Sequence, residues 1–496
     1  MSGDDGDPED VADATGEESV VRRERFSGGP AREFLSSLSA DGRIFAADLA
    51  VDRAHVVMLT EQGIIGSEDA AAILAALADI EAAGHGALPG GEDVHEAIET
   101  AVIERIGPAG GRMHTARSRN DEVAACLRYR LREDLLGTVE TVVEGRAALL
   151  STAAEQTETI MPGYTHRQPA QPTTVAHWLC SYESALARDT ARLLDAYDRV
   201  NQSPLGAAAF AGTTFDVDRE RTASLLGFDG LVENAMDAAA TRDFLVETTA
   251  GVAGLGTTLS GLSEDVVEFA SDGHVNLADE YASTSSIMPQ KKNPDTMELV
   301  RSRAGDASAG LSGLLTTLTG LPRAYNRDLQ RASGHAWDAI DAVTEAVPVA
   351  VGAVTTAEWP EAALAEAAGD GFATATGVAD LLAQSGIPFR TAHEVVAQAG
   401  GGSGTPDLDA VDRACRAVLD QPLAAVVDPD AVGKALDPAA NVAARGSRGG
   451  PAPEVVEDHL GRAREGVEAD RETLTDRRET IETAASTLDA EVTSYV

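Results

Sequence analysis

The sequence predicts an all-α protein organised around a bundle of long helices. Hydrophobic residues make up 43% of the chain and aromatic residues only 4%, a balance that favours closely packed helices over a sheet sandwich. Three segments, 248–269, 297–318 and 337–354, carry apolar residues at alternating steps of four and three. Such a repeat buries a narrow stripe between nearly parallel helices. Each of these helices should be about 25 residues, or about 38 Å, long.

The length of 496 residues is too great for a single hydrophobic core and favours about three domains. We expect an acidic disordered extension over residues 1–20, because this stretch is poor in apolar residues. An N-terminal helical domain should follow over 21–116. The central long-helix domain is then expected over 117–363 and a small helical C-terminal domain over 364–496.

The chain is strongly acidic, with 81 Asp and Glu residues against 39 Lys and Arg, and a net charge of -42. This charge argues against nucleic acid and against anionic membranes as partners, because both would be repelled. Nearly all the cations are arginines, since the only lysines are Lys291, Lys292 and Lys434. This composition is typical of a protein from a salt-loving organism, in which hydrated carboxylates maintain solubility.

The excess of negative charge predicts a salt-dependent stability. Repulsion among carboxylates destabilises the compact state unless salt screens it. We therefore expect the midpoint of thermal unfolding, followed by circular dichroism, to rise steadily from dilute buffer to multimolar salt. An unchanged midpoint would contradict this expectation.

The three cysteines, Cys126, Cys180 and Cys415, are widely spaced and lie within helical patterns. They favour small buried hydrophobes in a reducing cytoplasm over a disulfide framework or a zinc site. The acidic N-terminus does not resemble a signal peptide. The longest mostly apolar runs, 250–262 and 346–357, fall short of the roughly 20 residues that a membrane span requires. We therefore expect a cytoplasmic protein.

The first part of the chain predicts helices separated by glycine-rich breaks. Helical patterning runs from about Phe45 to Ala83, and a short helix over Gly91–Glu99 presents His95 near its start. A lone histidine in this position is more often structural than functional. The turn-rich segment Arg25–Pro30 should be a loop.

The stretch Gly111–Glu122 indicates the entry to a long helix. Arg117, Ser118, Arg119 and Asn120 together offer forked donors and amide hydrogen bonds that suit carboxylates. The arginines could equally be solvated side chains at a helix entry.

The stretch Pro162–Thr174 contains three prolines and cannot be the interior of a regular helix. It predicts a rigid loop that holds Thr165 and His166 in fixed positions, as a catalytic group requires. Such a loop could also serve only to connect two long helices.

Beyond about Ala363 the pattern shortens into compact helices over 373–385, 390–399 and 408–419. A charged segment over 454–487 then indicates a solvated helix. The glycine run 400–404 does not follow a strand, and the chain contains no G-x-x-x-x-G-K-[ST] motif, so no nucleotide-binding fingerprint is present.

The stretch Ser283–Glu298, with the sequence S-T-S-S-I-M-P-Q-K-K-N-P-D-T-M-E, is the most informative. Asn293 is a good N-cap and Pro294 a preferred first helical residue, so a helix should begin there. The helix N-terminus and Lys291 together would form an anion site. Facing a cation and a helix start, the hydroxyl of Ser285 or its neighbour could lose its proton more easily than a free serine. The alternative is an ordinary polar loop that caps a helix.

Three separated stretches, H-T-A-R-S-R-N-D, G-Y-T-H-R-Q-P-A-Q-P and S-S-I-M-P-Q-K-K-N-P-D, occur in this order along the chain. Their order and spacing resemble the argininosuccinate lyases of the fumarase/aspartase superfamily. The likeness covers residues 25–451 and includes R-F-S-G, E-D-V-H and Y-N-R-D-L-Q. The superfamily shares the serine and lysine loop, while H-T-A-R-S-R-N-D and Y-N-R-D-L-Q favour this family over fumarase, aspartase or adenylosuccinate lyase.

The resemblance implies a three-domain fumarase/aspartase-like fold whose central bundle assembles into a homotetrameric helical core. It also implies an anti elimination that converts argininosuccinate to arginine and fumarate, the last step of arginine biosynthesis. In the family, each active site is built from three different subunits. The reaction needs a base, an acid and a cationic cradle, so we expect no cofactor and no metal.

Carried over residue by residue, the resemblance implies that Ser285 removes the proton next to a carboxylate. Lys291 and Asn293 would stabilise the resulting aci-carboxylate. His166, with Glu298 as its partner, would act as the general acid or position the substrate. The residues that the resemblance assigns to substrate binding are Ser27, His95, Arg119, Asn120, Thr165, Arg242, Asn293, Tyr325, Arg327 and Gln330.

The chain departs from the family pattern at several positions. Ala116 and Thr284 stand where glycine is usual, Glu122 where glutamine is usual, and Arg167 where leucine is usual. Arg327 stands where lysine is common, which keeps the charge but changes its geometry. The rival interpretations are a sister lyase acting on another fumarate adduct, a crystallin-like structural protein on the same fold, and an acidic helical scaffold.

Overall fold

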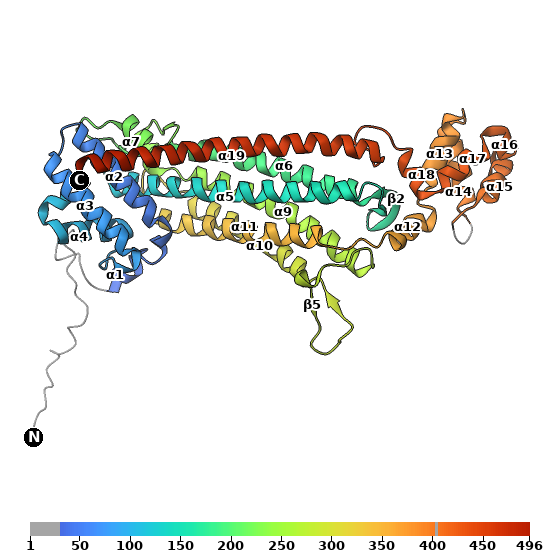
Figure 1. The fold of residues 1–496 in the computed structure, drawn as a ribbon, viewed down its shortest axis with the longest axis horizontal. Helices are drawn as coiled ribbons and strands as arrows, with labels where there is room; N and C mark the ends of the chain where they lie inside the picture. The colour runs from blue at the N-terminus through green and yellow to red at the C-terminus, as the bar shows by residue number, and fades with distance from the viewer. Residues whose placement is uncertain (1–29, 402–404) are drawn as a thin grey trace, which may run out of the picture.

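The computed structural model describes residues 30–401 and 405–496. Ser27 and the predicted acidic extension 1–20 lie outside the described residues. The molecule is elongated, with short helices at each end and long helices between them (Figure 1). The predicted all-α class is confirmed, since strands form only three two-stranded sheets in the described part of the chain.

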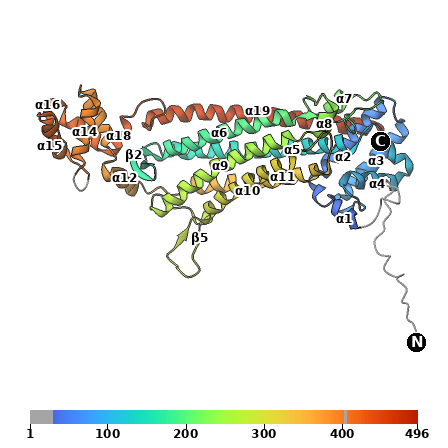
Figure 2. The same ribbon diagram turned by 180° about the vertical axis from the view of Figure 1, so that it is seen from behind.

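The central bundle consists of five long helices, which run side by side (Figures 1 and 2). The three predicted heptad segments fall in the third, fourth and fifth of these helices in chain order. Their stripes bury Val252, Leu259, Val300, Leu314 and Val347. The five helices are α5 (Arg119–Glu155), α6 (Val175–Val200), α9 (Asp243–Ser271), α10 (Asp295–Leu318) and α11 (Ala332–Thr355).

Small residues allow three of these helices to approach closely. A Cβ built on Gly256 of α9 would lie 3.3 Å from Cα of Ala304 on α10. A Cβ built on Gly310 of α10 would lie 2.7 Å from the carbonyl oxygen of His335 on α11. Real Cβ atoms do not approach a carbonyl oxygen so closely, so larger residues at these positions would force the helices apart.

The sixth long helix, α19 (Pro453–Tyr495), has 43 residues and runs along the outside of α5 and α6 (Figure 1). One of its faces buries Val456, Leu460, Val467 and Leu474 in the main core. The predicted solvated helix is therefore longer than expected, and one of its faces is buried against the bundle.

The N-terminal end is built from short helices. The patterning predicted from 45 to 83 forms two helices, because Gly63 takes a left-handed φ of 68° that ends the first. Asp93 caps α4 by accepting a hydrogen bond from the N–H of Glu96 at 2.8 Å. The elements are α1 (Pro30–Leu35), η2 (Ala40–Ile44), α2 (Phe45–Glu61), α3 (Ser67–Ala83), η3 (His85–Ala87), α4 (Val94–Ile106) and η4 (Pro108–His114).

The opposite end carries a separate small core, which includes Val378, Leu382, Val395, Val411 and Val432. As predicted, its helices are compact. They are α12 (Glu361–Gly369), η7 (Asp370–Phe372), α13 (Ala375–Gln384), α14 (Phe389–Ala399), α15 (Leu408–Leu419), α16 (Leu423–Val426), α17 (Pro429–Leu436) and α18 (Pro438–Ala443).

The remaining elements are short segments between the long helices. Three sheets pair β1 (Ile160–Thr165) with β2 (Gln168–Thr174), β3 (Gln202–Ser203) with β4 (Gly230–Leu231), and β5 (Ser283–Thr284) with β6 (Lys292–Asn293). The short helices are α7 (Arg219–Leu225), α8 (Ala235–Ala240), η5 (Asp279–Tyr281) and η6 (Arg327–Arg331).

The proline-rich stretch predicted as a loop is the antiparallel hairpin of β1 and β2. In a two-stranded ribbon every strand has a free edge, so a proline without an N–H can be accommodated. The cysteines are buried and free, as predicted. Among residues 30–401 and 405–496, no helix combines the length and the apolar character needed to cross a membrane.

Candidate functional site

His166 occupies the tip of the β1–β2 hairpin. Thr165 pairs with Gln168, so His166 and Arg167 form a two-residue turn, with φ values of 55° and 59°. Two successive positive φ values define the turn type that matches the twist of a hairpin, and histidine tolerates this region better than most residues. Arg167 forms an ion pair with Glu268 of α9. The hairpin therefore presents the exposed side chain of His166 at a defined place.

Ser285 and Lys291 lie at the neck of the loop between β5 and β6. The hydroxyl oxygen of Ser285 accepts hydrogen bonds from the N–H groups of Ile287 at 3.3 Å and Met288 at 3.0 Å. The N–H of Ser285 donates to the carbonyl of Lys291 at 3.4 Å. The loop projects away from the bundle in Figure 1, and Ile287 is 82% exposed. The serine is thus held by its own loop, away from the rest of the chain.

The prediction that Asn293 caps the following helix is wrong. Asn293 belongs to β6 and pairs with Ser283, while α10 begins at Asp295 with Pro294 as its N-cap. Pairing in the hairpin fixes the backbone of Asn293 in an extended form and moves the helix start onward. Glu298 lies in the first turn of α10, where the helix dipole favours its negative charge.

The two adjacent lysines have different surroundings. The Nζ of Lys292 lies 2.8 Å from a carboxylate oxygen of Asp279 and donates to the side chain of Asn276 at 3.3 Å. Lys291 is exposed beside the loop of Ser285. Lys292 therefore secures the base of the loop, and Lys291 is the lysine left to meet a ligand.

Four predicted binding residues, His95, Tyr325, Arg327 and Gln330, line a cavity of about 290 Å³ at the N-terminal end of the bundle. Arg327 forms an ion pair with Glu92 and donates to the side-chain oxygen of Gln330 at 3.3 Å. The sequence separates His95 from the other three by more than two hundred residues, so the fold brings them together here.

Arg119 and Asn120 open helix α5 at the same end of the molecule. Ser118 caps this helix with Asp121 in a capping box. Arg119 lies 3.2 Å from a carboxylate oxygen of Asp93, and the side chain of Asn120 donates to the carbonyl of Ala209 at 3.1 Å. The two side chains are half-buried, so a ligand could reach both.

Arg242 is buried at the N-cap of α9, where it donates to the carbonyl of Thr241 at 2.7 Å. Its Nε and Nη2 are buried without a hydrogen-bond partner in the described part of the chain. Burial lowers the pKa of Arg242 to about 10, and the nearby Tyr325 counters this only in part. A buried cation with two unpartnered N–H groups is suited to an anionic ligand.

A network of buried charges lies behind the cavity. It consists of Asp48 and Asp52 on α2, His95 on α4, and Arg117 and Glu122 around the start of α5, and we call it the buried network. Arg117 contacts Asp52 at 2.6 Å and Glu122 at 2.9 Å. His95 Nδ1 contacts Asp48 at 2.8 Å and Glu122 at 3.7 Å. Arg117 is therefore occupied by internal carboxylates and, unlike Arg119, does not face a ligand.

The charges of the buried network follow from competition between burial and pairing. Burial raises the pKa of Asp52 to about 7, although Arg117 opposes the change. Burial would lower the pKa of His95, but Asp48 and Glu122 outweigh it and raise the pKa to about 10. The two carboxylates therefore favour the protonated form of the His95 ring.

Asp48 and Asp52 were not among the residues predicted from the sequence. The available signal was their spacing of four residues within the apolar helix Phe45–Glu61, which places two carboxylates on one face. Carboxylates are almost never fully buried unless paired, so this pattern predicts buried cationic partners.

The predicted residues thus form three separate groups in one chain. Thr165 and His166 lie at the hairpin, while Ser285, Lys291 and Asn293 lie at the projecting loop and Glu298 in the first turn of the helix that follows it. The cavity end holds His95, Arg119, Asn120, Arg242, Tyr325, Arg327 and Gln330. Figure 1 places β2, β5 and α4 in three different regions of the molecule, so a single chain does not bring the three groups together.

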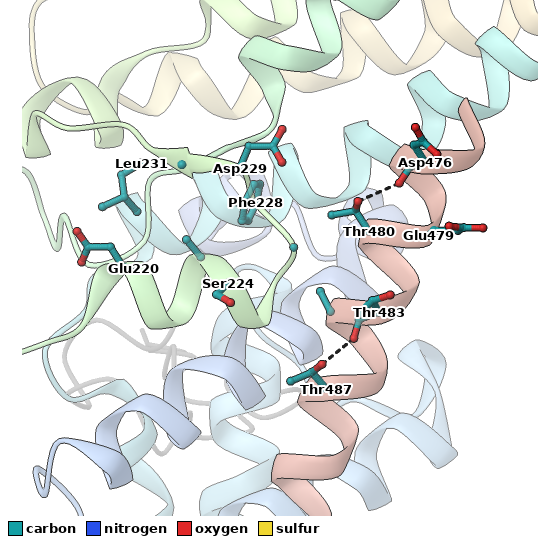
Figure 3. A pocket seen from close by; sticks show the side chains of 14 residues that line it. Glu220, Ser224, Phe228, Asp229, Leu231, Asp476, Glu479, Thr480, Thr483 and Thr487 are labelled. Atoms are coloured by element: carbon teal, nitrogen blue, oxygen red, sulfur yellow. Dashed lines mark hydrogen bonds between the residues drawn. The ribbon is translucent and has the colours of Figure 1, made fainter. Parts of the chain in front are cut away.

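A larger groove of about 770 Å³ lies between α7, β4 and α19 (Figure 3). Its lining includes Glu220, Asp229, Asp476 and Glu479 but none of the predicted site residues. The hydroxyls of Thr480 and Thr487 donate to carbonyls of their own helix, and the acidic side chains in Figure 3 point in different directions. The groove therefore lacks convergent polar groups, and the three groups remain the candidate site.

Comparisons with known proteins agree with this choice. A family model described as lyase matches residues 33–308, and one described as argininosuccinate lyase C-terminal matches residues 372–443. The chain is 67% identical to an argininosuccinate lyase of Haloarcula marismortui, covering 99% of this chain and 100% of that protein. It is 68% identical to an argininosuccinate lyase of Natronomonas pharaonis, covering 98% of this chain and 99% of that protein.

Among solved structures, an EDDS lyase variant with bound fumarate superposes with a TM-score of 0.84 at 34% sequence identity. The superposition covers 94% of this chain and 96% of that chain. The fold and the sequence relationship therefore extend over nearly the whole molecule.

Proposed function

The chain belongs to the argininosuccinate lyase family, and from this premise we propose that it catalyses the reversible elimination of argininosuccinate to arginine and fumarate. The observation that carries the proposal is the full-length identity of 67% and 68% to two argininosuccinate lyases. Both relatives come from halophilic archaea, in keeping with the acidic composition of this chain.

In the proposed reaction, the hydroxyl oxygen of Ser285 takes the proton from the carbon next to a carboxylate of the succinyl group. The two backbone N–H groups that already point at this oxygen would stabilise it as an alkoxide. Lys291, beside the same loop, stabilises the aci-carboxylate that forms. The elimination then breaks the bond between carbon and the guanidinium nitrogen.

His166 and the cavity residues complete the proposed chemistry. His166, paired with Glu298, protonates the departing nitrogen or holds the substrate for that step. The cationic side chains Arg119, Arg242 and Arg327 bind the carboxylates, because guanidinium forks match carboxylate geometry. Further hydrogen bonds to the substrate come from Thr165, Asn120, Asn293, Tyr325, Gln330 and His95. Ser27, which lies outside the described residues, supplies another.

We further propose that the protein is a homotetramer whose active sites each combine groups from three subunits. The separation of the three residue groups within one chain supports this proposal, since elimination requires them around one substrate. Exposed apolar side chains on the bundle, Leu299 and Leu315 of α10, offer surface for burial between subunits.

The direct test is a fumarate absorbance assay in high salt. We expect argininosuccinate to release fumarate, while adenylosuccinate, malate and aspartate do not. Release of fumarate only from one of the other three compounds would replace the proposed substrate. Folded protein that releases fumarate from none of the four would remove the lyase proposal and leave a structural role on the same fold.

The shared active site predicts that two inactive variants restore each other. When Ser285→Ala and His166→Gln chains are unfolded and refolded together, some sites should receive an intact Ser285 and an intact His166 from different subunits. Activity absent from either variant alone should then appear. The matched control is Ser285→Ala refolded with Lys291→Met. Both changes lie in one loop, so every loop carries a defect and no activity should return. Hybrids that form without recovering activity in the first mixture would contradict the shared site.

A further inference from the structure

The side chain of His95 lies between a cavity and a buried carboxylate. Its ring lines the cavity of about 290 Å³, yet its side chain is only 3% exposed. The Nδ1 atom is turned away from the cavity, towards Asp48 of the neighbouring helix α2 at 2.8 Å. The nitrogen left for the cavity is therefore Nε2.

Asp48 has no exposed side-chain surface, and each of its carboxylate oxygens has a close polar neighbour. One oxygen contacts His95, and the other accepts a hydrogen bond from the thiol of Cys126 at 3.3 Å. A buried carboxylate must be paired with a cation to remain charged. Arg117 makes its close contacts with Asp52 and Glu122 instead, so the cation paired directly with Asp48 is His95.

An imidazole held in this way has a fixed orientation and a fixed charge. A carboxylate 2.8 Å from Nδ1 favours the protonated ring through its charge and leaves Nε2 to meet the ligand. The charged ring then offers Nε2–H as a donor, and a hydrogen bond from a cation to a carboxylate is about twice as strong as a neutral one.

We propose that Asp48 is a positioning residue, which holds His95 as an imidazolium whose Nε2–H donates to a carboxylate of the bound substrate. This inference deepens the proposed function and rests on it for the identity of the ligand, a substituted succinate. Asp48 does not touch the substrate; it acts through His95.

Charged groups on several elements surround His95, and they include His114 of η4, which lies 3.4 Å from a carboxylate oxygen of Glu99. Arg117 compensates Asp52 and Glu122 at close range. Asp41, whose pKa is raised chiefly by burial, accepts hydrogen bonds from Ser37 at 2.7 Å and from the N–H of Val94 at 3.2 Å. Asp93 contacts Arg119. Across the cavity lies Arg327, which pairs with Glu92. Burial lowers the pKa of His95, and Asp48 is the nearest carboxylate and the strongest influence that opposes it. Removing the charge of Asp48 should therefore lower this pKa.

The test uses the isosteric substitution Asp48→Asn in the full-length enzyme in high salt. We expect the KM for argininosuccinate at pH 8 to rise about tenfold, with a much smaller change in kcat, because one charged hydrogen bond is weakened. In wild type the KM should be flat between pH 6 and 9. In the variant it should increase with pH in a single titration, as the ring of His95 loses its proton within this range.

Cys126→Ser is the matched control. It alters the other partner of Asp48 and preserves the ion pair with His95, so its KM should stay flat over the same pH range. In a His95→Gln background, Asp48→Asn should have little further effect on KM. If His95→Gln and Asp48→Asn raised KM equally and additively, the inference would be overturned. A KM in Asp48→Asn that remains independent of pH would also overturn it.

A second measurement does not depend on the substrate or on a variant of Asp48. In wild-type enzyme labelled with ¹⁵N-histidine, the ring signals of His95, assigned by their loss in His95→Gln, should remain those of an imidazolium from pH 6 to 9. A neutral ring at pH 8 would overturn the inference even if the enzyme releases fumarate. An imidazolium in a protein that releases no fumarate would instead uphold the pairing and refute only the proposed function.

Discussion

Replacing Ser285 with alanine is expected to lower the turnover of argininosuccinate by about 10²–10⁴-fold, the usual contribution of a positioned base. The structure explains why this hydroxyl differs from others in the chain. It sits at the neck of an exposed loop, two backbone N–H groups point at its oxygen, and Lys291 lies beside it. Steady-state fumarate release in high salt measures the effect.

The matched control is Ser286→Ala, which removes the adjacent and more exposed hydroxyl of the same loop. Its turnover should stay within a few-fold of wild type, an effect of about 1 kcal/mol or less. If Ser285→Ala merely loosened the loop, KM would rise and kcat would be preserved. Near-normal turnover in Ser285→Ala would remove Ser285 from the role of base.

Replacing Arg117 with methionine is expected to produce the largest loss of stability, about 3–5 kcal/mol in the free energy of unfolding. Arg117 contacts Asp52 and Glu122 in the interior at 2.6 and 2.9 Å, and its loss would leave two buried carboxylates without their cation. The midpoint of denaturant unfolding at constant high salt measures the change.

This loss should grow with pH. Burial already raises the pKa of Asp52 to about 7 in the presence of Arg117, and removal of the cation raises it further. A carboxyl group whose pKa is higher in the folded than in the unfolded state stabilises the fold below its unfolded pKa. This stabilisation disappears as the pH rises through the folded pKa. The variant should therefore be closer to wild type at pH 5 than at pH 8.

Arg112→Met serves as the matched control, because Arg112 belongs to the same end of the molecule and pairs with Asp69 while 56% exposed. An exposed pair contributes about 0–1 kcal/mol, so the unfolding midpoint should barely move. Equal losses in the two variants, or a loss in Arg117→Met that is independent of pH, would contradict the assignment of Arg117 to the buried network.

The long helices could be predicted because their signal is repeated along the chain. In a heptad stripe such as Val252, Leu255 and Leu259, the spacing of the apolar residues alone predicts which face of the helix is buried, whichever element packs against it. The short features could not be predicted in this way. Asn293 has the properties of a helix cap, but its backbone is engaged by Ser283 across the β5–β6 hairpin, and that pairing overrides the local preference.

The arrangement of the candidate site could also be predicted only in part from the sequence. The sequence motifs identified Arg327 and Gln330, yet only the fold reveals that these side chains share a cavity with His95. The carboxylates behind His95 were missed because Asp48 and Asp52 lie in a helix that otherwise resembles ordinary core. Neither the residue type nor its spacing in the sequence indicates which cation pairs with a buried carboxylate, because the cation lies on a helix that is distant in sequence.

The outer helix α19 also bears on how the protein is made. It packs along α5 and α6, and near its far end Glu491 meets Arg221, which in turn contacts Glu61 of α2. All of these partners emerge from the ribosome before residues 453–495 do. Until that segment has been translated, the apolar side of the nascent bundle that faces α19 stays uncovered, and exposed apolar surface of this kind is prone to aggregation.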